Sequence, residues 1–208
     1  MSTVFDKYYK RYDVWYDKNK FVYLSEIETI KKVLPKEAKG LEIGVGTGRF
    51  AAPLGITIGI DPSTAMIHIA EQRGVNVRRG LGENLPFFED TFNYVAIIIT
   101  ICFVKNPLRV LQEAYRVLVN NGKLIVGIID KDSFLGRYYQ KKKSMFYKEA
   151  NFLSVRELTK LLEKGGFENL EYYQTIFKLP DEINSIQKPQ KGFGKGGFVV
   201  ITSEKRRT

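Results

Sequence analysis

Apolar runs of strand length alternate with amphipathic helical segments along most of this chain. Seven strands are expected, at residues 40–45, 56–60, 75–79, 94–101, 123–129, 170–177 and 197–203. Apolar residues at helical spacing indicate helices at residues 21–34, 63–73, 108–118 and 155–167. Because parallel strands need a crossover connection, this alternation predicts a doubly wound α/β fold with a mainly parallel sheet, an antiparallel last strand and helices on both faces.

The expected sheet also predicts where a ligand binds. Residues 94–101, YVAIIITI, form the most continuous apolar run, which is typical of a central strand buried on both faces. A doubly wound sheet has one binding crevice, outside the carboxyl ends of its strands. The glycine-rich stretch LEIGVGTGRF, residues 41–50, begins in the first strand and runs on to this edge.

The chemistry of this glycine-rich turn differs from that of a phosphate loop. Its glycines read G-x-G-x-G instead of G-x-G-x-x-G, and no G-K-[ST] follows them, so NAD and a Walker A nucleotide both match poorly. Glu42 lies at the mouth of the turn, where a carboxylate would repel a pyrophosphate and attract a cation. Asp61 closes the second strand, where an acid can accept hydrogen bonds from both ribose hydroxyls. A ribose with a cation and no phosphate describes S-adenosylmethionine.

Five segments in register resemble the class I S-adenosylmethionine-dependent methyltransferases, most closely their small-molecule branch. They are E-x-G-x-G-x-G (42–48), GIDPS (59–63), GENLPFFEDTFNYV (82–95), RVLVNNGKLIV (116–126) and FLSVRELTKLLEKGGF (152–167). The resemblance covers about residues 8–178 and implies a Rossmann-like fold that transfers a methyl group from S-adenosyl-L-methionine and releases S-adenosyl-L-homocysteine. No metal is expected.

The resemblance also implies which residues hold the cofactor. Glu42 would face its ammonium group, the glycines would let the backbone approach its methionyl and sugar portions, and Asp61 would bind its ribose. The segment around Glu83 would contact the adenine. The full implied set is Glu42, Gly44, Gly46, Gly48, Asp61, Gly82, Glu83 and Leu85.

Several positions depart from the family pattern. Leu81 stands where many relatives carry an acid that contacts the adenine amino group, and Asn93 replaces a frequent aspartate. Asn120 and Asn121 replace the usual proline and glycine before the fifth strand. Only RFAAPLG, residues 49–55, separates the turn from the second strand, which predicts a short first crossover.

No catalytic residue is identified. Where a histidine often follows the fourth strand, this chain has Cys102 and Phe103, and its one histidine, His68, falls in the helix after Asp61. An isolated cysteine at a strand end is typical of core packing, and one cysteine with one histidine excludes a Cys/His zinc site. Methyl transfer is an in-line displacement, so proximity and alignment in a water-poor pocket are expected to provide the catalysis.

Two aromatic-rich segments are expected to cover the crevice within a single domain of residues 1–208. They are an N-terminal helical cap, about residues 1–35, and a lid-like insertion, about residues 131–153. Aromatic faces attract cations such as a sulfonium or an amine, although most of these rings are expected only to pack. Tyr12, Trp15 and Tyr138, with Cys102 and Phe103, are the substrate and lid candidates.

The net charge of +10 resides in residues 137–148 and 186–208, which we interpret as a solvated loop and a frayed tail. Two alternatives stay open: an RNA or protein methyltransferase that uses these basic segments, and a cofactor-binding protein that has lost catalysis. The preferred hypothesis is a cytoplasmic monomer or homodimer that methylates a small molecule and has no specific nucleic acid or membrane partner.

Overall fold

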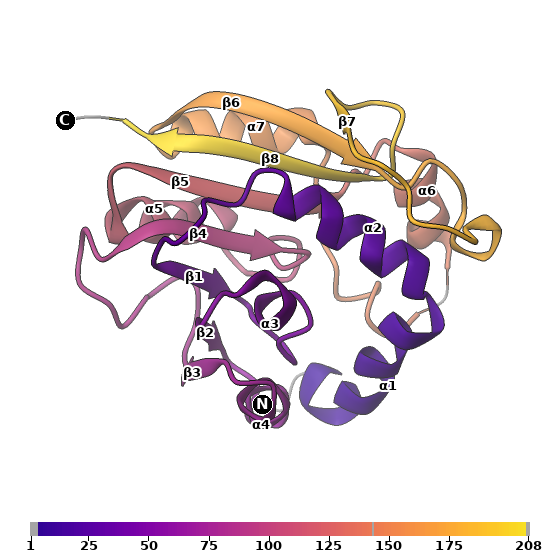
Figure 1. Cartoon of the computed structure of the whole chain (residues 1–208), viewed down its shortest axis with the longest axis horizontal. Helices are drawn as coiled ribbons and strands as arrows, with labels where there is room; N and C mark the ends of the chain where they lie inside the picture. The colour runs from indigo at the N-terminus through magenta and orange to yellow at the C-terminus, as the bar shows by residue number, and fades with distance from the viewer. Residues whose placement is uncertain (1–3, 143, 207–208) are drawn as a thin grey trace.

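The computed structural model describes residues 4–142 and 144–206, so Lys143 and Arg207 of the basic segments lie outside the described residues. One mixed sheet of eight strands runs through the described part of the chain (Figure 1). Its strands are β1 (Gly40–Ile43), β2 (Ile58–Asp61), β3 (Asn76–Arg79), β4 (Phe92–Ile98), β5 (Leu118–Ile129), β6 (Phe167–Thr175), β7 (Gln190–Lys191) and β8 (Phe198–Lys205).

The helices follow the predicted alternation. They are α1 (Val4–Lys18), α2 (Lys20–Lys31), α3 (Ala51–Leu54), α4 (Thr64–Gln72), α5 (Pro107–Val117), α6 (Phe134–Lys141) and α7 (Val155–Lys164), with a 3-10 turn at Pro180–Glu182. Serine and asparagine side chains begin several of them: Ser63 accepts a hydrogen bond from Met66 N, and Asn106 accepts one from Arg109 N. Ser154 and Glu157 form a reciprocal capping box at α7.

The strand order β3-β2-β1-β4-β5-β8-β6-β7 places a topological switch between β1 and β4. The chain builds outward from β1 through β2 to β3, and then returns to place β4 on the other side of β1. Neighbouring strands from β3 to β5 are parallel, and β8 lies antiparallel between β5 and β6. The switch predicts a binding crevice beyond the carboxyl ends of β1 and β4.

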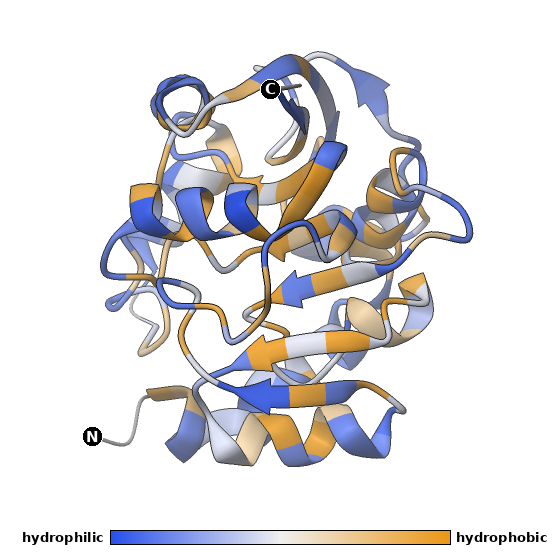
Figure 2. Cartoon of the chain, turned by 90° about the vertical axis from the view of Figure 1, so that its left-hand side faces the viewer, coloured by the Kyte–Doolittle hydropathy of each residue, from blue (hydrophilic) through white to orange (hydrophobic). Residues whose placement is uncertain are grey.

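Alternate side chains of the central strand enter two cores, one on each face of the sheet. Tyr94, Ala96 and Ile98 pack with α2 and α3, whereas Val95 and Ile97 pack with α5 and α7. Figure 2 shows apolar residues along much of the strands, and both polar and apolar residues along the helices. β4 is therefore the buried central strand that its apolar run predicts.

The structure differs from the sequence predictions mainly at element ends. β4 ends at Ile98 instead of residue 101, because Ile99 adopts a positive φ of 51° and turns the chain. The short β7 adds an eighth strand at the edge, beside β6. The expected frayed tail is wrong as far as Lys205, since β8 continues to this residue, whose Nζ donates to Leu118 O and Asp90 Oδ1. The expected short first crossover is present as the four-residue α3.

Helices α1 and α6 lie at the end of the sheet to which β4 points (Figure 1). They come from the N-terminal segment and from the insertion after β5, the two regions expected to cover the crevice. None of the helices in the described part of the chain is long and apolar enough to span a membrane.

Candidate functional site

The glycine turn follows β1 and has a different structural requirement at each glycine. Gly44, Gly46 and Gly48 all have positive φ, at 72°, 54° and 77°. A Cβ on Gly44 would lie 2.1 Å from Thr100 Cγ2, and one on Gly48 would lie 3.2 Å from Ala70, so packing requires both glycines. A Cβ on Gly46 would meet only Tyr12 Cε1, at 3.9 Å. Gly46 thus borders open space beneath α1.

Two acids flank this turn. Glu42 is 1% exposed, and its Oε2 accepts no hydrogen bond from the described residues. Burial, followed by the charge of Asp61, raises the pKa of Glu42 well above its usual range. Asp61 Oδ2 accepts from Gly46 N and Oδ1 from Ser63 N, each at 2.9 Å. A buried carboxylate oxygen without a partner, next to a turn with open space, fits a ligand that carries a cationic group.

The segment expected to contact adenine, residues 82–85, is fastened from both sides. Gly82 is buried, and a Cβ there would lie 2.7 Å from Ile43 Cγ2. Glu83 Oε1 accepts from Lys105 N at 3.0 Å, which joins this segment to the loop before α5. Leu85 is 4% exposed and packs in the core, and its N donates to Glu113 Oε2. Packing and hydrogen bonds within the fold account for the contacts that these three residues make.

Asp13 of helix α1 contacts the turn and the residues that flank it. Asp13 Oδ1 accepts from Thr47 Oγ1 at 2.7 Å, and Asp13 also forms ion pairs with Arg49 and Arg73, both at 2.8 Å. These hydrogen bonds hold the pKa of Asp13 well below its usual range, although burial alone would raise it. The contact fixes α1 to the residues that follow Gly46, so the cap and the turn form one structural unit.

A cavity of about 230 Å³ lies beside the turn, between α1, α2 and the insertion. Helix α1 contributes Phe5, Tyr12, Trp15 and Tyr16, and the insertion contributes Tyr139, Phe146, Tyr147 and Phe152. Ile99, Cys102 and Phe103 line the cavity from the turn after β4. Tyr12 belongs to both sites, since it lines the cavity and is the side chain nearest the open side of Gly46.

One carboxylate, Glu26 of α2, lines this aromatic cavity. Its side chain is buried, with the residue 1% exposed, and its Oε2 accepts no hydrogen bond from the described residues. Burial raises the pKa of Glu26 to about 8. The cavity therefore combines ring faces with one unsatisfied acidic group.

The other predicted lid and substrate residues are placed as follows. Trp15, Cys102 and Phe103 line the cavity, and the tyrosine of α6 that lines it is Tyr139 instead of Tyr138. Tyr138 stacks under the ammonium of Lys142. Burial raises the pKa of Cys102 to about 12, so its thiol stays protonated near neutral pH and is a poor nucleophile.

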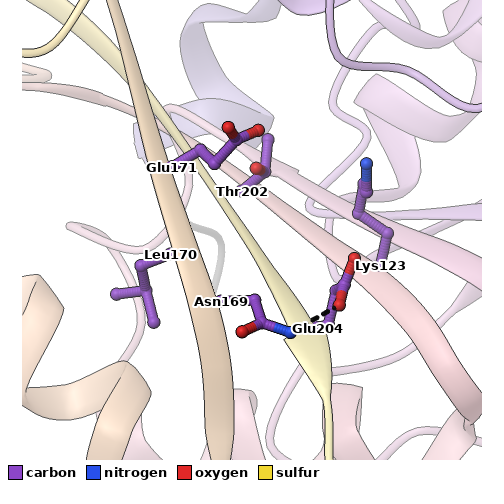
Figure 3. Close-up of a pocket in the computed structure, with 6 residues that line it drawn as sticks. All are labelled: Lys123, Asn169, Leu170, Glu171, Thr202 and Glu204. Carbon is purple, nitrogen blue, oxygen red and sulfur yellow. Dashed lines mark hydrogen bonds between the residues drawn. The ribbon is translucent and has the colours of Figure 1, made fainter.

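A second hollow lies on the opposite part of the sheet (Figure 3). Its volume is about 360 Å³, and side chains from β5, β6 and β8 line it. Asn169 Nδ2 donates to Glu204 Oε2 at 2.9 Å there. Lys123, on its rim, pairs in register with Tyr94, near the start of β4. This hollow is thus at the amino ends of the parallel strands, away from the turn and the cavity.

Sequence reasoning did not single out Glu26 or Asp13. Helical spacing could have indicated Glu26, because this residue lies on the buried side of α2 with the apolar residues Val22, Ile27 and Ile30. An acid at such a position is a departure from amphipathic patterning. Asp13 had no such signal, since its partners Arg49 and Arg73 are distant in sequence.

The fold and the turn together define an α/β protein of the Rossmann-like type, with two buried acids beside a glycine-rich turn. The methyltransferase domain family matches residues 41–126. An uncharacterized protein of Methanocaldococcus jannaschii is 50% identical, covering 98% of this chain and 99% of the relative. A demethylmenaquinone methyltransferase of Geobacillus sp. is 32% identical, and the match covers 95% of this chain and 88% of that relative.

A solved structure agrees with these relatives. It is the SAM-dependent methyltransferase of Thermotoga maritima described as a possible histamine N-methyltransferase, with a TM-score of 0.95 and 49% identity. The match covers 97% of this chain and 98% of that one. The chain belongs to the class I S-adenosylmethionine-dependent methyltransferases.

Proposed function

We propose that this methyltransferase transfers the methyl group to a small molecule enclosed in the aromatic cavity. The observation that carries the proposal is the shared position of Tyr12, between the open side of Gly46 and the cavity. An acceptor in the cavity would therefore lie next to the cofactor turn. A volume of about 230 Å³ admits a small molecule but no folded macromolecule.

The cofactor would be held by residues around the turn. Glu42 would receive its ammonium group, the backbone at Gly46 would lie against its methionyl portion, and Asp61 would accept from the ribose hydroxyls. The bound S-adenosylmethionine supplies an electrophilic methyl group on a sulfonium. The chain contributes alignment of the acceptor and exclusion of water, which are the main requirements of an in-line displacement.

Two relatives suggest different acceptor chemistry. The Geobacillus relative is named for a quinone precursor, and the Thermotoga structure for an amine. Both acceptors named are small molecules, which supports the proposal and leaves the acceptor atom open. The alternative in which RNA or protein is the acceptor draws only on the basic segments.

The test is a fractionated acceptor screen. The purified enzyme is incubated with S-adenosylmethionine labelled in its methyl group, and separately with the metabolite, RNA and protein fractions of a cell extract. We expect label in the metabolite fraction and stoichiometric S-adenosylhomocysteine. Label confined to RNA or protein would overturn the proposal, and cofactor binding without label in any fraction would favour an inactive binding protein.

A further inference from the structure

Glu26 differs from the other buried polar residues of its helix. Ser25 Oγ donates to Phe21 O and accepts from Gln187 N, and Thr29 Oγ1 donates to Ser25 O. Both hydroxyls are thus satisfied within the protein. Glu26 Oε2 is buried without a partner among the described residues, and none of the ion pairs between those residues includes Glu26.

An unpaired buried carboxylate is costly for a fold. Desolvation of such an ion costs several kcal/mol, so packing alone would favour an apolar side chain at this position of α2. The raised pKa of Glu26, about 8, expresses the same cost. A ligand that donates a hydrogen bond or brings a positive charge would offset this desolvation cost.

The walls around Glu26 favour a cation. Tyr16 is 3% exposed and Tyr139 3% exposed, and the Tyr139 and Tyr147 rings lie 4.6 Å apart. Burial raises the pKa of all three hydroxyls, so these rings stay neutral and add no negative charge of their own. A protonated amine gains from both the rings and the carboxylate, whereas an anion would meet the carboxylate without compensation.

Two cationic side chains also border the cavity and must be weighed against Glu26. Arg11 and Lys142 are both exposed, and the ammonium of Lys142 lies 5.3 Å from the centre of the Tyr138 ring. Solvent and salt screen exposed charges strongly and buried charges much less. Once ionised, Glu26 is therefore the least screened charge that borders the cavity.

We propose that the methyl acceptor is a small amine, held in the cavity as an ammonium ion by the carboxylate of Glu26. This inference rests on the proposed small-molecule function and names its substrate class and recognition residue. It also favours an amine over a quinone-like acceptor, which carries no positive charge to pair with Glu26.

The proton balance gives Glu26 a second part in the reaction. An ammonium nitrogen has no lone pair, so it first transfers a proton to the Glu26 carboxylate. The freed lone pair forms the new N–C bond to the methyl carbon, while the C–S bond of the donor breaks and its electron pair stays on sulfur. The products are an N-methylammonium ion and S-adenosylhomocysteine, and the proton on Glu26 then passes to water.

The test uses acceptor analogues that differ only in the terminal group. One set is 2-phenylethylamine, 2-phenylethanol and phenylacetate, and the other is histamine, histaminol and imidazoleacetate. Binding is measured by calorimetry with S-adenosylhomocysteine in the cofactor site. We expect at least one amine to bind about tenfold or more tightly than its alcohol, and the acids to bind most weakly.

Glu26→Gln should abolish this preference for the amine. Glu28→Gln is the matched control, because Glu28 lies on the same helix with its side chain 48% exposed and paired with Lys31. The amine affinity of the wild type should rise with pH through about 8, as Glu26 ionises. The affinity of Glu26→Gln should stay flat over that range.

A measurement without ligand checks that Glu26 is buried and unpaired. Its folded pKa of about 8 exceeds the unfolded value of about 4.3, so the folded state binds more protons between these values. The free energy of unfolding of the wild type should then fall, relative to that of Glu26→Gln, as pH rises from about 5 to 8. Thermal melts of the variant also establish that it folds.

The outcomes separate this proposal from the one on which it rests. If neither amine binds more tightly than its alcohol, or if the preference survives in Glu26→Gln, amine recognition by Glu26 is overturned. A small-molecule acceptor found in the fractionated screen would then still support the proposed function. Label only in RNA or protein would overturn both proposals.

Discussion

Gly46 combines a left-handed backbone with an open position. Gly46→Val should cost folding stability, because a β-branched residue is strained at φ 54°, by about 1–2 kcal/mol. Its side chain would also enter the space beneath Tyr12, so we expect cofactor binding to be lost. Calorimetry with S-adenosylhomocysteine measures this loss.

The control for Gly46→Val is Gly55→Val. Gly55 has a φ of 72°, and a Cβ there would meet nothing within 4 Å. This variant carries the same kind of backbone strain but leaves the turn intact, so it should bind the cofactor normally. Normal binding by a folded Gly46→Val would mean that the turn has only a structural role.

Asp61 is predicted to bind ribose, yet it also accepts from Gly46 N and Ser63 N. Asp61→Ala should weaken S-adenosylhomocysteine binding by about 1.5–3 kcal/mol, the range for hydrogen bonds to a charged acceptor. The two roles are separated by a 2′-deoxyribose analogue of the same ligand. A ribose contact predicts that the variant loses less affinity for the analogue; equal losses for both ligands would show that Asp61 only supports the turn.

The residues predicted from the sequence were those whose chemistry is local. Gly44 and Gly46 follow directly after β1, and both have the positive φ that glycine favours. Glu26 was missed because its isolation depends on Tyr16, Tyr139 and Tyr147, which reach the cavity from other elements. Helical spacing indicates a buried face but does not show whether a polar group on that face has a partner.

At the scale of elements, Asp13 joins α1 to two arginines that lie outside this helix. Asp13→Asn should leave the guanidinium groups of Arg49 and Arg73 without their shared anion, and destabilise the protein by about 1–3 kcal/mol. Urea unfolding measures the loss. Asp17→Asn is the control, since Asp17 pairs with Arg49 but its side chain is 63% exposed, and it should cost much less.

The ion pairs of Asp13 also predict how the free energy of unfolding changes at acid pH. The pKa of Asp13 is depressed in the folded protein, so its contribution is present above the unfolded value of about 3.9 and is lost as pH falls below it. Asp13→Asn should therefore lose less stability than the wild type when pH falls from about 5 to 3. Parallel acid-induced losses in the two proteins would contradict this role.

Element types were predictable and element ends were not. Continuous apolar runs predicted strands such as β4 and β8, because a strand buried on both faces is apolar nearly throughout. β3 and β6 are partly exposed, and their sequences alternate more. The end of β4 at Ile98 depends on a positive φ at Ile99, which apolar patterning does not signal. The docking of α1 depends on contacts with residues such as Arg73, distant in sequence.

At the scale of the whole molecule, the excess positive charge is distributed among several structural roles. Lys205 is 8% exposed and donates to Leu118 O, and Lys191 pairs with Glu171. Lys142 borders the cavity. Part of the charge is thus committed to contacts within the fold, which leaves fewer cations for a continuous phosphate-binding surface.

The alternative of an RNA substrate is therefore tested with exposed lysines outside the described ion pairs. Replacing Lys141, Lys188 and Lys195 together by glutamine should leave turnover of a small acceptor within about twofold, because none of the three lines the cavity. If RNA were the substrate, each lost phosphate contact would lower both the affinity and its dependence on salt. Binding of labelled RNA at several salt concentrations measures both quantities. Tight RNA binding by the wild type, with a shallower salt dependence in the triple variant, would favour the RNA alternative over an enclosed small acceptor.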